Sequence, residues 1–282
     1  SSPAHCPRPA ARLTLRSLTV RGRSPKGVDV EGAEAVDRLA RLMREPAVPA
    51  FKQDAGTLLS GAAITMDRSK WHPPSAVELA TTLSHFRALR AASAELRRAR
   101  GSEVLILEDD ADLSLVPCWS RFLDTLRSYA SRLSGSWEFV QLGSVDRIAF
   151  RVAADSPAER PLFVRRRAHH WGAAATLWHD RGLSRLLERH PDTARGVLTV
   201  AGLDALHACG VVADSCIYTP HVPVASEVPA ARGGYLAVPP LILAARPRAW
   251  QHDSSIQTSQ HVATRAHHLD EIATWAQRLW CS

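Results

Sequence analysis

The stretch Leu105-Ile106-Leu107-Glu108-Asp109-Asp110 holds the strongest structural signal in this chain. Its apolar part has the length of a strand and is hydrophobic enough to be central in a sheet. Because side chains alternate along a strand, Ile106 and Glu108 are expected on one face of the sheet and Leu107 on the other. The three carboxylates follow directly, at the C-terminal edge of the strand, where open α/β sheets bind ligands.

The acidic residues at this strand end predict a cation site. Adjacent carboxylates repel one another unless a cation neutralises them, and ligands that are all oxygen select Mg²⁺ or Mn²⁺ over softer metals. We expect Asp110 to be the principal ligand, with Glu108 and Asp109 completing or orienting the site. Asp112 lies two residues further on and is another oxygen donor. The alternative is a solvated turn in which Asp112 caps the helix that follows.

The segments around this strand alternate between helical and extended patterns. The clearest helix runs over 75–98, where Ser75 and Glu78 form a capping box and apolar residues recur with the helical period. Further helices are expected over 31–44, 117–133, 183–187, 200–209 and 262–279, and further strands over 13–20, 137–142, 173–178 and 215–218. The proline-rich stretch 222–247 reads as irregular. This order predicts an α/β fold with a mostly parallel sheet and helices on both faces.

Composition and charge limit the classes of function. The chain has 282 residues and a formal net charge of +7, which suits an anionic ligand. Its arginines are scattered without interleaved aromatic residues, so we expect no nucleic-acid partner. No apolar run approaches the roughly 20 residues that span a bilayer, so we expect no transmembrane segment. We divide the chain into a proline-rich N-terminal arm, 1–12, and a single domain, 13–282.

The cysteines give a limited indication of the compartment. Five cysteines without a CxxC pair argue against a zinc ribbon. Cys209 and Cys216 lie close enough in sequence to pair in an oxidising lumen, and free thiols are the alternative. Both the lumen of the secretory pathway and the cytoplasmic face of a bacterial membrane stay open.

Motifs on both sides of the acidic strand come in a recognisable order. Glu78 to His85 reads Glu-Leu-Ala-Thr-Thr-Leu-Ser-His, and the Leu-Glu-Asp-Asp strand end follows after the rest of that helix. Further matching segments are 137–143, 171–178 and Gly202-Leu203-Asp204. Together they resemble glycosyltransferase family 25, which includes lipooligosaccharide and collagen galactosyltransferases. The resemblance extends over residues 20–260.

The resemblance implies a GT-A-like fold and a metal-dependent, inverting transfer. The sugar, with galactose as the first choice, moves from a UDP-sugar donor to a saccharide or a hydroxylated protein, with Mn²⁺ or Mg²⁺ as the cofactor. The site residues expected on this basis are Asp109, Asp110, Asp112 and His252 around the metal, Glu108, Asp109 and His85 for binding the cofactor and donor, and Asp204 for catalysis.

Two of these residues have alternative roles. Asp204 is the candidate base or acceptor-orienting residue, because it starts a short helix that the resemblance places near the same edge of the sheet; a helix cap is the alternative. His85 lies inside a helix, where it either orients the acidic loop or is a satisfied core histidine, and the structural role is favoured.

Two rival functions stay open. A catalytically degenerate relative that acts as a binding or scaffold protein is favoured by departures from the family. The opening strand is degenerate, and Ser255 stands where the family's closing Ser-Asp-Ile motif has aspartate. A phosphoryl-transfer enzyme or nuclease usually has a lysine near its acids, whereas Lys26, Lys52 and Lys70, the lysines of this chain, all lie upstream of them.

Overall fold

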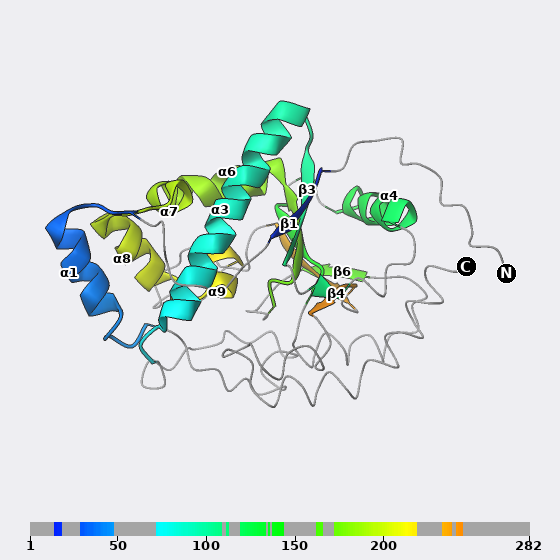
Figure 1. Ribbon diagram of the computed structural model, residues 1–282. Coiled ribbons are helices and arrows are strands. Elements are labelled where there is room, and N and C mark those ends of the chain that lie inside the picture. Colours follow the sequence, from blue (N-terminus) through cyan, green and yellow to red (C-terminus); the bar gives the residue numbers. More distant parts are fainter. Residues whose placement is uncertain are drawn as a thin grey trace.

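The computed structural model describes residues 14–18, 29–47, 72–108, 111–112, 119–133, 135, 137–143, 162–165, 172–218, 233–238 and 241–244. These residues form an α/β fold in which helices flank a mixed sheet (Figure 1). The main sheet has the strand order β1-β3-β7-β5-β9-β6. Its strands are β1 (Thr14–Leu18), β3 (Glu103–Glu108), β7 (Ala175–His179), β5 (Phe139–Gln141), β9 (Gly234–Val238) and β6 (Leu162–Arg165).

Short strand pairs and helices surround the main sheet. The paired strands are β2 (Asp29–Val30) with β8 (Val197–Leu198), which are parallel, and β4 (Ala111–Asp112) with β10 (Leu243–Ala244), which are antiparallel. The helices are α1 (Gly32–Leu42), α3 (Ala76–Ala99), α4 (Trp119–Ala130), α6 (Asp180–Arg189), α7 (Pro191–Arg195), α8 (Val200–Ala208) and α9 (Ala213–Tyr218). Within the described part of the chain, none of the helices combines the length and the apolar character needed to cross a membrane.

The α/β class is confirmed, but the expectation of a mostly parallel sheet is wrong. β1 and β3 are parallel, as are β5 and β9, whereas β7 runs antiparallel to both β3 and β5, and β6 runs antiparallel to β9. Alternation and burial look the same whichever way a neighbouring strand runs, so the apolar pattern of a strand does not reveal direction. The direction of a strand depends on the chain connections that lead into and out of it. β7 lies in the sheet between β3 and β5, which both run in the opposite direction.

Strand β3 separates two layers of the core, as its alternation predicts. Val104 and Ile106 belong to a buried cluster with residues of α3, α6 and α9. Leu105 and Leu107 belong to a second cluster with Phe122 and other residues of α4. Helices therefore cover both faces of the sheet, with α4 on one side and α3 and α6 on the other (Figure 1).

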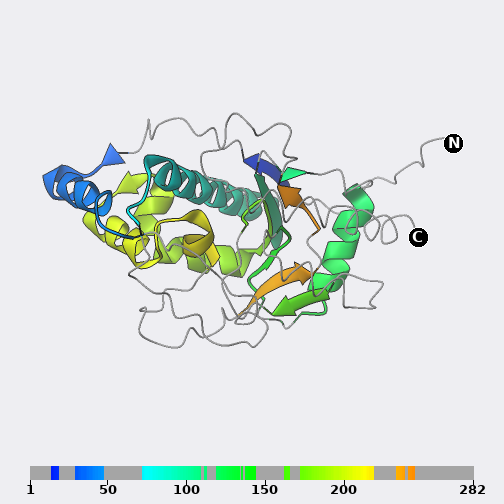
Figure 2. The same ribbon diagram turned by 90° about the horizontal axis from the view of Figure 1, so that it is seen from below.

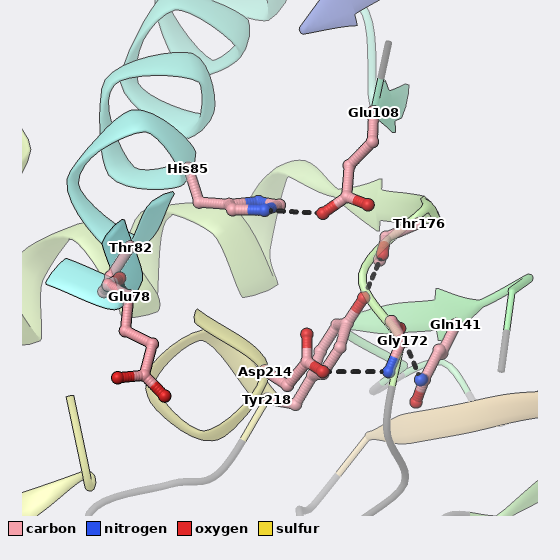
Figure 3. Close-up of polar contacts among 9 residues, drawn as sticks. All are labelled: Glu78, Thr82, His85, Glu108, Gln141, Gly172, Thr176, Asp214 and Tyr218. Atoms are coloured by element: carbon pink, nitrogen blue, oxygen red, sulfur yellow. Dashed lines mark hydrogen bonds and ion pairs between the residues drawn. The ribbon is translucent and has the colours of Figure 1, made fainter. Parts of the chain in front are cut away.

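Helix α3 begins and ends where its sequence predicts. The Ser75 hydroxyl accepts a hydrogen bond from the Glu78 N–H at 3.1 Å, and the Glu78 carboxylate accepts one from the Ser75 N–H at 2.7 Å. The helix stops at Arg100, whose φ of 52° is left-handed, just before Gly101. Its buried residues are Leu79, Thr82, Leu83, His85, Phe86, Leu89, Ala92, Ser93 and Leu96. This buried face brings His85 to the end of β3 (Figure 3).

Two expectations for the second half of the chain are wrong. Residues 215–218 lie in α9 instead of in a strand, and the stretch 222–247 contains β9 and β10. A four-residue apolar run fits either a strand or one turn of a helix. Here Cys209 and Cys216 form a disulfide, with their Cα atoms 4.9 Å apart, and this bond closes the turn in which α9 begins. The expected N-terminal arm and the C-terminal helix lie outside the described residues.

Candidate functional site

The acidic strand end belongs to an edge where three neighbouring strands meet. Leu107 of β3 pairs with Ala175 of β7, and Gln141 of β5 pairs with Thr176 of β7. The C-terminal ends of β3 and β5 therefore flank the start of β7, because β7 is antiparallel to both. Glu108, Gln141 and Thr176 come together at this edge (Figure 3).

The chain that follows β9 returns to the same edge. The N–H groups of Leu241 and Ile242 donate to the Leu142 carbonyl at 2.8 Å and 3.3 Å, and β10 then pairs with β4, which follows the acidic residues. The approach depends on Gly143, since a Cβ there would lie 2.9 Å from the Ile242 carbonyl oxygen. β10 thus pairs with Asp112, while His252, later in the sequence, lies outside the described residues.

His85 and Glu108 form the central contact of the edge. The Nε2 atom of His85 lies 2.8 Å from Oε1 of Glu108 (Figure 3). His85 is only 2% exposed, as a core residue would be, and the Glu108 side chain is 21% exposed. A buried donor that bonds a half-buried carboxylate fixes the direction of that carboxylate. His85 is therefore a buried residue of α3 that also contacts the last residue of β3, and its role toward Asp109 and Asp110 stays a prediction.

The expected metal ligands are described only in part. Asp109, Asp110 and His252 lie outside the described residues, and Asp112 is described only as the backbone of β4. Among the described side chains, no group of three or more His, Cys, Asp or Glu residues is arranged to hold a metal ion. The expected donors are the aspartates that follow Glu108 in the sequence and the later His252, which suit Mn²⁺ or Mg²⁺, and the metal set stays a prediction.

Asp204 contacts a residue of α1, and its expected role as the base stays a prediction. It is inside α8 and exposed, and its Oδ1 accepts from Nε of Arg38 on α1 at 2.6 Å. This hydrogen bond raises the pKa of the Arg38 guanidinium above its ordinary value. The helix-cap alternative is wrong, because the Thr199 hydroxyl caps α8 by accepting from the Gly202 N–H at 3.0 Å. In both views α9 lies between α8, the helix that contains Asp204, and the main sheet (Figures 1 and 2).

The edge contains polar contacts that the sequence analysis missed. The amide of Gln141 donates to the Gly172 carbonyl at 2.7 Å, and the Gly172 N–H donates to Asp214 at 2.9 Å. The hydroxyls of Thr176 and Tyr218 are hydrogen-bonded to each other. A glutamine within the apolar run of β5 is a signal that sequence reasoning can use, since buried polar groups need partners. Asp214 had no such signal, because its segment was read as the approach to a strand.

Shifted pKa values at the opposite edge have structural causes. Burial raises the pKa of Glu103 at the start of β3, and burial lowers the pKa of His179, its partner across the strands. His179 also caps α6, because its ring accepts from the Arg181 N–H at 3.2 Å, and it packs edge-on against Trp137. Both groups thus have local roles in the fold, and neither marks a second site.

The chain was also compared with known proteins. No protein-family model and no curated protein matches it. The functional interpretation therefore depends on the contacts at the strand edge and on the motifs of the sequence.

We expect Thr199→Ala to cost about 1 kcal/mol of unfolding free energy, because it removes the N-cap of α8. Asp204→Ala should cost less than about 1 kcal/mol, because the Asp204 side chain is 56% exposed and water screens its ion pair with Arg38. Urea denaturation of both variants measures the difference. Thr199→Ser keeps the hydroxyl and is the matched control; a larger loss for Asp204→Ala than for Thr199→Ala would contradict this assignment.

Proposed function

We propose that this chain is a metal-dependent glycosyltransferase similar to family 25, which transfers a sugar from a UDP-sugar donor to a saccharide or a hydroxylated protein. Galactose is the first choice of sugar. The observation that carries the proposal is the His85–Glu108 contact at 2.8 Å. It joins the segment that ends in Ser84-His85 to the Glu-Asp-Asp strand end, and these are the two motifs on which the resemblance mainly depends. Two motifs that are separate in the sequence are thus in contact.

The other described contacts of the edge support the same proposal. Glu108 makes two contacts that hold it in place. Its side chain bonds His85, and its backbone N–H donates to the Ala174 carbonyl at 2.9 Å. The last residue of β3, which Asp109 and Asp110 follow in the sequence, is therefore held at both its side chain and its backbone. A cation bound there offsets the charge of the diphosphate leaving group. Glu108 orients the acidic segment, and Asp110 is the proposed principal ligand.

A nucleotide-binding protein without transferase activity is the second candidate. The ion pair between Asp204 and Arg38 favours it, because this contact turns the candidate base toward α1 and leaves the base of the reaction unassigned. The two candidates differ in one measurement: both bind the nucleotide with the cation, and only the transferase releases sugar from the donor.

Mn²⁺ with uridine diphosphate is expected to stabilise the fold. At ten times the dissociation constant the ligand adds about 1.4 kcal/mol to the free energy of unfolding, since it binds only the folded chain. Thermal denaturation over a concentration series measures the shift. Uridine with Mn²⁺ and uridine diphosphate with a chelator are the controls. Absence of a shift with every nucleotide and cation pair would overturn the donor assignment.

A further inference from the structure

The turn between α8 and α9 is held in an uncommon conformation. Val211 has a φ of 62°, in the left-handed region that β-branched residues rarely adopt, and it is fully buried. Such a residue persists only where its surroundings determine it. The Cys209–Cys216 disulfide encloses it, and the Val211 carbonyl accepts from the Thr82 hydroxyl of α3 at 2.5 Å. The turn is therefore fixed by a covalent bond and by a contact to the helix that carries His85.

This turn places Asp214 against the start of β7. Asp214 lies between the two cysteines of the disulfide in sequence, and its Oδ2 accepts from the Gly172 N–H at 2.9 Å (Figure 3). Gly172 has a φ of 110°, which side-chain-bearing residues avoid, and its carbonyl accepts from the Gln141 amide at 2.7 Å. The Gly172 backbone is thus bonded through both its N–H and its carbonyl, and the bond to the carboxylate is charge-assisted.

The start of β7 in turn supports the acidic strand end. Two residues after Gly172, the Ala174 carbonyl accepts from the Glu108 N–H at 2.9 Å. A displacement of Gly172 would therefore be transmitted to Glu108 through the backbone of residues 172–174 and this hydrogen bond. Tyr218 of α9 adds a second connection, because its hydroxyl is bonded to that of Thr176 in β7.

We propose that Asp214 is a positioning residue of the candidate site, held by the Cys209–Cys216 disulfide and acting on the acidic strand end through the backbone of Gly172. Only the link to nucleotide binding rests on the proposed function; the positioning itself is measured on the chain alone. Asp214 bonds Gly172, and its effect on the expected metal ligands passes through β7 and Glu108.

Hydrogen exchange of the full chain tests the positioning. In Asp214→Ala the amides of Glu108 and of residues 174–177 should exchange about tenfold faster, while those of α3 away from the edge keep their rates. Asp214→Asn should restore slow exchange, because its amide oxygen still accepts from Gly172. Asp124→Ala, which removes an exposed carboxylate of α4, is the matched control and should behave like the parent. Unchanged exchange at Glu108 in Asp214→Ala would overturn the proposal.

Reduction of the disulfide gives a second measurement without any substitution, should Asp214→Ala unfold. Dithiothreitol supplies two electrons and two protons, so that Cys209 and Cys216 become thiols and the reagent becomes a cyclic disulfide. The same amides should then exchange about tenfold faster. If Asp214→Ala unfolds as a whole and reduction leaves these amides unchanged, Asp214 is a stability residue and the proposal fails.

Binding of uridine diphosphate with Mn²⁺ separates this inference from the proposed function. The affinity of Asp214→Ala should fall about tenfold, in the range known for residues that orient metal ligands, with Asp214→Asn close to the parent. Parent-like affinity in Asp214→Ala despite faster exchange would overturn the positioning role at the site. A parent chain that binds no nucleotide refutes the proposed function, and the exchange rates still decide whether Asp214 positions the strand end.

Discussion

Asp110→Asn is expected to lower sugar transfer by about 10² to 10³-fold, the scale seen when one group that stabilises developing charge is removed. The variant keeps the shape of the side chain but takes one negative charge from the acidic segment. Folding should be retained or slightly improved, because repulsion between neighbouring carboxylates falls. Turnover of the UDP-sugar with Mn²⁺, together with the melting temperature, measures both effects.

Asp124→Asn is the matched control for this variant. Its side chain is 67% exposed on α4, with Arg127 nearby at 3.7 Å, so transfer and stability should both stay near the parent values. If Asp110→Asn transfers sugar at the parent rate, the acidic residues form a solvated turn, and the metal assignment fails.

His85→Ala is expected to lower the free energy of unfolding by about 2 to 3 kcal/mol. The substitution leaves a cavity beneath α3 and removes the partner of the Glu108 carboxylate, and both effects act in the same direction. Urea denaturation measures the loss, and an unchanged dependence on urea concentration shows that unfolding remains two-state.

A double-mutant cycle isolates the contact itself. His85→Ala and Glu108→Ala should be coupled by about 1 to 2 kcal/mol, since residues in one hydrogen bond do not contribute independently. Glu108→Ala combined with Thr199→Ala, which removes the cap of α8, should be additive. Additivity in the first pair would mean that the 2.8 Å contact contributes nothing to stability and would weaken the proposed function.

Local sequence features determined the parts of this protein that depend on near neighbours. The capping box at Ser75 and Glu78 set the start of α3, and the apolar alternation around Ile106 set the strand and its two faces. The position of Glu108 at the end of β3 followed as well, because the last residue of a strand lies at the edge of the sheet. The sequence also predicts His85 and Glu108 as site residues, and the two are in contact.

Only the tertiary structure decided the direction of β7, the helix in place of a strand at 215–218, and the partners of the polar residues. Asp204 and Arg38 of α1, 166 residues apart in the sequence, are joined by a hydrogen bond that no local pattern predicts. Asp214 and Gly172 meet across 42 residues. The local periodicity of apolar residues indicates which face of a helix or strand is buried. It does not indicate which other helix or strand packs against that face. Direction and pairing between distant segments arise when the apolar faces pack, and that packing is a property of the whole chain.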